Sequence, residues 1–144
     1  MPAKPTVVVG FFGSVLDAGN PDDRWDRWRP TIDVVSHEDL VVSRFHLLHD
    51  EKAGKAAAAL AEDVRQVSPE TEAVLHGLPL PDVWDFEPVY GALHDLARRL
   101  AFDPDREDLL VLITAGSHVE QICLFLLTGS RHLPGRALQA RAPP

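Results

Sequence analysis

The chain has 144 residues, of which 45% are hydrophobic and 25% are charged, and these shares exclude a disordered, collagen-like or coiled-coil protein. Its length fits one domain with its own hydrophobic core. The formal net charge of −8 disfavours nonspecific attraction to nucleic acid, which needs an excess of lysine and arginine, so an anionic ligand has to be bound locally.

The first half of the chain predicts strands and helices in alternation. A β-branched run at residues 6–10 predicts a buried strand that enters a tight, glycine-containing turn. Pro30 suits the first turn of a helix that runs through Val35, and residues 44–48 predict a second strand. The alanine-rich stretch at residues 52–67 carries leucine and valine at helical spacing and predicts a second helix.

The second half of the chain continues this alternation. A rigid loop at residues 77–81 precedes a helix that extends to Leu100, with Asp85 as its N-cap. Residues 118–128 predict a further helix, and three segments predict strands, at residues 71–76, 109–114 and 137–139. The alternation predicts an α/β fold, Rossmann-like and doubly wound, with a mainly parallel sheet and helices on both faces.

One loop follows the first predicted strand directly. Ligands of doubly wound sheets bind at the carboxyl ends of the strands, and residues 10–14 offer small side chains, free amides and a hydroxyl there. This loop could hold a phosphate, or a nucleotide base against Phe12, although it lacks the dinucleotide pattern G-x-G-x-x-G. An ordinary turn with Phe12 in the core explains the same residues, and the spacing leaves both interpretations open.

A second loop, residues 114–118, leaves the long apolar strand and opens a helix. Backbone amides, two hydroxyls and an imidazole converge there, where the helix dipole favours an anion. The alternative needs no ligand, because Ser117 can serve as the N-cap and His118 can lie in the first turn of the helix. We expect an anion site at this loop.

Residues 24–29 contain three arginines and two tryptophans, which could stack bases and pair with phosphates. Alternatively the two tryptophans pack on one helical face and the arginines pair with aspartates nearby in the sequence: Asp22, Asp23 and Asp26. His46, His49 and Asp50 lie close together in the sequence, but strand alternation sends the two histidines to opposite faces, so we expect no metal site.

Several features concern the setting of the chain. Cys123 is the only cysteine, so an internal disulfide is impossible and a reducing cytoplasm is expected. The N-terminus lacks the pattern of a signal peptide, and we expect no membrane-spanning segment. Residues 141–144 have the composition of a linker, which indicates a longer parent protein.

Six segments, taken together and in order, carry a family resemblance: residues 10–17 (GFFGSVLD), 24–31 (RWDRWRPT), 67–72 (VSPETE), 84–90 (WDFEPVY), 93–95 (LHD) and 113–123 (ITAGSHVEQIC). With them the chain resembles the N-terminal regulatory domains of the RtcR family, bacterial RNA-repair transcriptional activators with a CARF-like (CRISPR-associated Rossmann fold) sensing domain. The resemblance implies a ligand-sensing domain at residues 1–140 and the start of a linker at residues 141–144.

The resemblance also implies a function. In this family the domain restrains a following AAA+ ATPase that activates sigma-54 RNA polymerase, and it is thought to respond to RNA ends bearing a 2′,3′-cyclic phosphate or to another oligonucleotide. Related CARF domains bind cyclic oligoadenylates across a dimer through the loops after the first and fourth strands. We therefore expect a homodimer or higher oligomer without cofactor, metal or catalysis, whose ligand contacts Phe12, Gly13, Ser14, Val15, Arg24, Trp25, Arg29, Thr114, Ala115, Gly116, Ser117, His118 and Gln121.

Two alternatives stay open. Some CARF domains are ring nucleases that cleave cyclic oligoadenylate by holding a ribose hydroxyl in line with the scissile phosphate. In that case His118 or Ser117 would assist proton transfer or stabilise charge. The other alternative is a domain whose main task is assembly, with the apolar helix at residues 119–127 as either core or interface.

Overall fold

Five parallel strands form one sheet in the computed structural model of the chain, which describes residues 4–14, 16–17 and 23–144. The strands lie in the order β3-β2-β1-β4-β5, and each pairs in parallel with its neighbour. Their bounds are Thr6–Phe11 for β1, Val42–Asp50 for β2, Glu72–Leu78 for β3, Asp108–Leu112 for β4 and Arg136–Leu138 for β5. All the strands predicted from the sequence are therefore confirmed.

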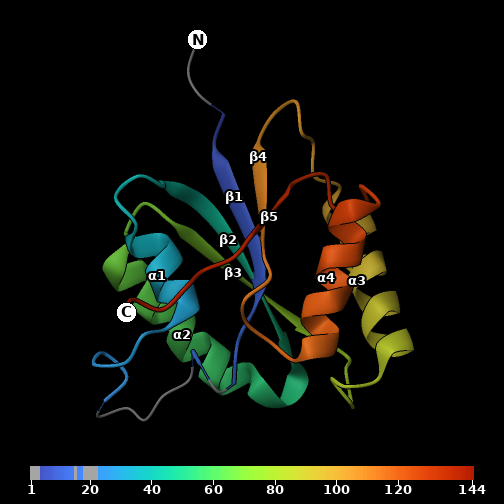
Figure 1. Cartoon of the computed structure of the whole chain (residues 1–144), viewed down its shortest axis with the longest axis horizontal. Coiled ribbons are helices and arrows are strands. Elements are labelled where there is room, and N and C mark those ends of the chain that lie inside the picture. Colours follow the sequence, from blue (N-terminus) through green and yellow to red (C-terminus); the bar gives the residue numbers. More distant parts are fainter. Residues whose placement is uncertain (1–3, 15, 18–22) are drawn as a thin grey trace.

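Helices cover both faces of this sheet (Figure 1). They are α1 (Pro30–Ser36), α2 (Gly54–Val67), α3 (Phe86–Leu100) and α4 (His118–Gly129), and a short 3₁₀ helix, Glu51–Ala53, leads into α2. α1 and α2 contact each other on one face, and α3 and α4 contact each other on the other face. The predicted doubly wound α/β architecture is confirmed.

The central strand β1 explains why the core has two halves. Its successive side chains point to opposite faces of the sheet, so Val7 and Val9 join the cluster beneath α3 and α4, whereas Val8 joins the cluster beneath α1 and α2. All three are at most 1% exposed. A strand covered on both faces needs apolar residues at every position, and this need accounts for the uninterrupted β-branched run at the N-terminus.

The strand order places a crevice beside β1. The chain leaves β1 towards β2 on one side of the sheet and later returns through β4 on the other side. The connections that follow β1 and β4 therefore diverge over opposite faces, and a crevice opens between them at the carboxyl ends of the strands. Both loops expected to bind ligand lie at this edge of the sheet.

Some local details differ from the prediction. β3 extends to Leu78, so the first two residues of the expected loop at residues 77–81 belong to the strand. β4 ends at Leu112, and the amide of Ile113 donates instead to the carbonyl of Leu138. Asp85 precedes α3 as expected, but its side chain makes no cap hydrogen bond. Pairing with neighbouring strands, which local sequence does not encode, sets the strand ends.

Candidate functional site

A cavity of about 320 Å³ opens at the carboxyl ends of the strands. It is built mainly by the loop that follows β1 and by the turn between β4 and α4, the two segments expected to bind ligand. The predicted site residues that line it are Phe12, Gly13, Ser14, Thr114, Gly116, Ser117, His118 and Gln121. The two loops therefore meet in one cavity, as their positions after strands predicted.

The remaining predicted site residues lie elsewhere. Ala115 is 1% exposed and packs beneath the cavity, where its Cβ lies 3.1 Å from the position a Cβ would take at Gly13. Arg24, Trp25 and Arg29 do not line the cavity. Val15 lies outside the described residues. A direct contact between ligand and any of these residues stays a prediction.

Other lining residues were not among the predicted ligand contacts, although Phe11 and Leu16 belong to the loop after β1 that was expected to build the cleft. These lining residues come from all four connections at this edge: Phe11, Leu16, Asp50, Ala53, Val83, Trp84 and Glu120. Asp50 ends β2, which pairs with β1, so its position at the same edge follows from the strand order. Trp84 belongs to the block at residues 84–90 that carried the family resemblance, and this was the one sequence signal for its importance.

A capping box fixes the start of α4. The Ser117 hydroxyl oxygen accepts the amide of Glu120 at 3.1 Å, and the Ser117 amide donates to Glu120 Oε1 at 2.7 Å. The same hydroxyl donates to the carbonyl of Val83 at 2.7 Å. The interpretation of Ser117 as an N-cap is confirmed, and its hydroxyl is already engaged before any ligand arrives.

Hydrogen bonds also hold the turn that leads into α4. The Gln121 side-chain amide donates to the carbonyl of Gly116 at 3.0 Å and to that of Thr114 at 3.3 Å. The Thr114 hydroxyl accepts the amide of Ala140 at 2.7 Å. Gly116 has a φ of +100°, a conformation that side-chain-bearing residues rarely adopt. The turn is thus held in place by hydrogen bonds within the chain itself.

The cavity has an acidic wall. Glu120 is 4% exposed, and burial raises its pKa to about 7, with a further increase from the charge of Asp50. The hydrogen bonds from Ser117 lower the pKa but do not offset burial. No lysine or arginine is found among the described lining residues. Glu120 is therefore about half protonated near neutral pH.

The first prediction concerns the substitution Glu120→Gln. The folded chain holds a proton on Glu120 up to a pH of about 7, whereas the ordinary pKa is 4.5. The folded state therefore binds more protons than the unfolded state in this window, and stability falls as the pH rises through it. Glutamine keeps an oxygen for the Ser117 amide but does not ionise. Relative to wild type, we expect the variant to gain about 2–3 kcal/mol between pH 5 and pH 8.

Urea unfolding at the two pH values measures this gain. Glu62→Gln is the matched control, because Glu62 is an exposed acid on α2 whose side chain is 65% accessible. Its unfolding free energy should follow that of the wild type across the window. If Glu120→Gln also parallels the wild type from pH 5 to pH 8, the burial of a charge at Glu120 does not control stability.

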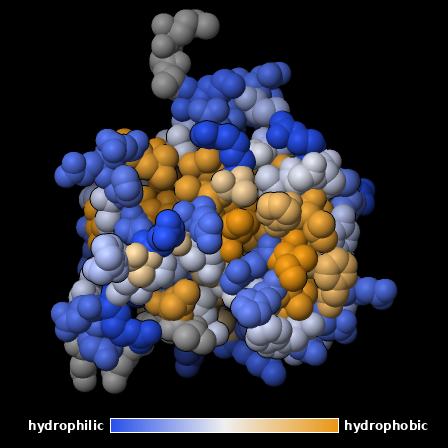
Figure 2. Space-filling view, in the orientation of Figure 1, coloured by the Kyte–Doolittle hydropathy of each residue, from blue (hydrophilic) through white to orange (hydrophobic). Residues whose placement is uncertain are grey.

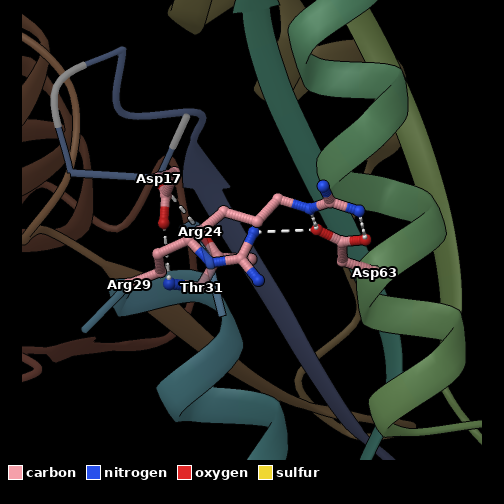
Figure 3. Close-up of polar contacts among 5 residues, drawn as sticks. All are labelled: Asp17, Arg24, Arg29, Thr31 and Asp63. Carbon is pink, nitrogen blue, oxygen red and sulfur yellow. Dashed lines mark hydrogen bonds and ion pairs between the residues drawn. The ribbon is translucent and has the colours of Figure 1, made fainter. Parts of the chain in front are cut away.

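A buried carboxylate organises the loop after β1. Asp17 is 1% exposed and accepts the amide of Gly13 at 2.9 Å. It also accepts the amide and the hydroxyl of Thr31, each at 3.1 Å (Figure 3). Burial raises the pKa of Asp17, although these hydrogen bonds and the charge of Arg29 oppose the rise. Asp17 thus ties the cavity loop to the first turn of α1.

The arginine and tryptophan segment is tied to α2. Asp63 accepts from Arg24 Nε at 2.8 Å and from Arg29 Nη1 at 2.8 Å (Figure 3), and the Arg29 guanidinium lies 4.8 Å from the centre of the Trp25 ring. Residues 23–26 form turns rather than the helical face considered from the sequence. Asp63 is thus a partner that the expected pairing with neighbouring aspartates did not include.

The histidines on β2 make hydrogen bonds within the fold. His46 Nδ1 lies 2.8 Å from His76 Nε2, and His49 Nδ1 lies 2.7 Å from the carbonyl oxygen of Asp50. Burial lowers the pKa of His46 to about 4, with further lowering by His76 and Arg44. Within residues 4–14, 16–17 and 23–144, no group of three or more potential ligands is placed to hold a metal ion.

No helix of the described residues is both long and apolar enough to span a bilayer.

Comparison with protein families decides the assignment. The family described as RtcR, regulator of RNA terminal phosphate cyclase, matches residues 4–144. The chain belongs to the RtcR family. It is 48% identical over 141 residues to the transcriptional regulatory protein RtcR of Escherichia coli strain K12, and the match covers 97% of this chain and 26% of that protein. The family resemblance noted in the sequence is confirmed, and the chain spans about a quarter of this relative.

Solved structures support the fold assignment. Csm6 of Enterococcus italicus, bound to cyclic hexa-2′-fluoro-hexa-dAMP, matches with a TM-score of 0.77 and 15% identity, over 98% of this chain and 35% of that chain. Can2 of Sulfobacillus thermosulfidooxidans, in complex with cyclic tetra-adenylate, matches with a TM-score of 0.64 and 12% identity, over 94% of this chain and 32% of that chain. The Rossmann-like, CARF-like fold of this RtcR-family chain is therefore confirmed.

Proposed function

We propose that this chain is the ligand-sensing domain of a sigma-54-dependent activator of RNA-repair genes, and that it binds an RNA end bearing a 2′,3′-cyclic phosphate. Membership of the RtcR family supports the regulatory part of this proposal. The observation that carries the ligand part is the cavity itself, where the loops after β1 and β4 meet at the switch point of the sheet. We propose binding without turnover.

The charge of the cavity favours a cyclic phosphate over an open one. A 2′,3′-cyclic phosphate is a diester with a single negative charge, whereas a terminal phosphate monoester carries about −1.5 to −2 at neutral pH. The wall of the cavity holds the carboxyl groups of Asp50 and Glu120, and the described lining residues offer no cation against them. A dianion is therefore penalised here more strongly than a monoanion.

Backbone amides can supply the attraction for a single charge. The N–H groups of His118 and Val119 open α4 and have no acceptor within the helix, and the helix dipole favours an anion at this end. Ser117 and Glu120 already use part of this end through the capping box. The amides that stay available at the start of α4 can bind one phosphodiester, but not a chain of phosphates. The rest of an RNA strand therefore needs other contacts.

The effect of binding would lie outside this chain. The Escherichia coli relative is about four times as long as the matched region, and we propose that ligand binding relieves the restraint on an AAA+ ATPase in the same polypeptide. We also propose that two copies pair through α4. Ile122, Phe125 and Leu126 lie on one side of that helix and are 51%, 58% and 44% exposed, and Figure 2 shows apolar atoms gathered over α4.

The RNA end provides the direct test of this function. One oligoribonucleotide is prepared with three ends, a 2′,3′-cyclic phosphate, a 3′-monophosphate and a 3′-hydroxyl, and the affinity of the chain for each is measured at pH 7. We expect the cyclic end to bind at least about tenfold more tightly than either other end, a difference of about 1.4 kcal/mol. Equal affinities for the three ends would overturn the proposal.

One histidine variant tests the cavity wall, and a second serves as its control. His118→Ala alters the cavity wall and should weaken binding of the cyclic end, whereas His132→Ala alters an exposed residue beyond α4 and should leave binding unchanged. The same proteins are incubated with labelled cyclic oligoadenylate. Cleavage products that vanish in His118→Ala would favour the ring-nuclease alternative over a sensor that leaves its ligand intact.

A further inference from the structure

The rim of the cavity carries an exposed tryptophan. Trp84 lines the cavity in the connection between β3 and α3, yet it is 61% exposed, so its indole lies at the mouth rather than inside. It meets the His118 ring edge to face, with the ring centres 5.9 Å apart and the planes at 81°. His118, which also lines the cavity, therefore supports the Trp84 indole at the mouth.

The backbone around Trp84 is held firmly. The carbonyl of the preceding residue, Val83, accepts the Ser117 hydroxyl at 2.7 Å, and the amide of Trp84 donates to Asp82 Oδ1 at 2.9 Å. Leu80, earlier in the same connection, is 6% exposed and belongs to the core cluster beneath α3 and α4. The loop is thus anchored at both the core and the α4 cap, while its largest side chain faces solvent.

A comparison with Trp25 shows that exposure alone does not define this feature. Trp25 is 48% exposed, but the guanidinium groups of Arg24 and Arg29 lie 5.7 and 4.8 Å from its ring centre. Among the described residues, the one aromatic ring in contact with Trp84 is that of His118. An indole that is fixed, lies at a cavity mouth and keeps an open face is suited to stacking on a flat ligand group.

The size of the cavity indicates which group this is. A volume of about 320 Å³ lies at the lower end of the range for small-ligand sites, which is about 300–1,000 Å³. It has room for a terminal nucleotide, so the preceding nucleotides of an RNA strand must leave through the mouth, past Trp84. The described lining residues include no lysine or arginine for their phosphates, whereas the exposed indole of Trp84 offers a surface on which their bases can stack.

We propose that Trp84, supported by His118, is a stacking platform for the base of the nucleotide that precedes the terminal one. This inference rests on the proposed function and adds a specificity to it, namely that the site reads the end of a strand and not a free mononucleotide. Because stacking on an aromatic ring accepts any base, the platform selects for strand continuity and carries little sequence preference.

A length series tests the platform. The chain is titrated with adenosine 2′,3′-cyclic phosphate and with tetra-adenylate ending in a 2′,3′-cyclic phosphate. We expect the wild type to bind the tetranucleotide about 5- to 100-fold more tightly than the mononucleotide, and its tryptophan fluorescence to be quenched by the tetranucleotide. Trp84→Ala should abolish this gain and the quenching, while it keeps the mononucleotide affinity within about twofold of wild type. Trp84→Phe retains a ring and should restore most of the gain.

The outcomes separate the platform from the site it serves. If Trp84→Ala keeps the full gain in affinity for the tetranucleotide, or loses affinity equally for both probes, the proposed stacking platform is contradicted. The proposed cyclic-phosphate site is not contradicted by either result. If the wild type binds neither probe, the proposed function fails and the platform fails with it. Circular dichroism of each variant confirms that the fold is retained, which is expected because Trp84 contributes little to the core.

Discussion

Replacing Asp63 with alanine is expected to lower the free energy of unfolding by about 3–5 kcal/mol. Asp63 is 2% exposed, and it accepts from both Arg24 and Arg29, whose own side chains are 29% and 2% accessible. Burial disfavours the charged form of Asp63, but the two arginines outweigh it and hold the pKa of this carboxyl below its usual value. Without Asp63, the buried Arg29 guanidinium loses the carboxylate to which it donates at 2.8 Å.

The loss should be specific to this buried pair. Chemical denaturation at pH 7 measures it, with Glu62→Ala as the matched control. Glu62 is the preceding residue on α2, and its ion pair with Arg65 is exposed on both sides, so its removal should cost less than about 1 kcal/mol. A loss for Asp63→Ala no larger than that for Glu62→Ala would show that Arg29 finds another counter-charge or water.

The same variants address the ligand role expected for the arginine segment. Asp63 pairs with Arg24 and Arg29 (Figure 3), and neither arginine lines the cavity. If this pairing is structural, ligand affinity per folded molecule should be unchanged in Asp63→Ala. A rise in affinity for the cyclic-phosphate RNA would instead indicate that the released arginines reach the ligand.

Replacing Gly116 with alanine is expected to cost about 2–4 kcal/mol of stability and to weaken ligand binding. About 1–3 kcal/mol comes from holding alanine at a positive φ, and about 1 kcal/mol from disturbing the cap. The φ of Gly116 is +100°, and an added Cβ would lie 2.9 Å from Glu120 Oε1 and 3.0 Å from the Cβ of Phe11. The Cβ of Phe11 is fixed by the backbone of β1, so the Glu120 side chain has to move. This movement breaks the hydrogen bonds of the capping box.

A second glycine provides the control. Gly91 lies in the middle of α3, and a Cβ added there meets no atom within 4 Å. Alanine at this position should therefore stabilise the chain by about 0.5–1 kcal/mol, because it improves helix propensity without a clash. Thermal and urea unfolding of the two variants, with RNA titration of the folded proteins, would contradict the prediction if both substitutions shifted stability in the same direction.

Local sequence determined the elements and the position of the two loops. The first strand could be predicted because burial on both faces of the sheet requires an uninterrupted apolar run. The alanine-rich helix could be predicted from the helical spacing of its apolar residues. Ser117 could be predicted as an N-cap because a cap depends on residues within one turn. The loops after β1 and β4 followed from the strands themselves, since parallel strands present their carboxyl ends at one edge.

Only the tertiary structure decided which side chains complete the cavity and which do not. Asp50 and Trp84 reach it from other connections, and Arg29 turns away from it to pair with Asp63, 34 residues further along the chain. Contacts between distant residues depend on strand order and helix packing, which leave no periodic signature in the sequence. The acidic wall of the cavity is an example. The sequence places Glu120 in the first turn of a helix, but only the fold shows that burial and the nearby Asp50 raise its pKa.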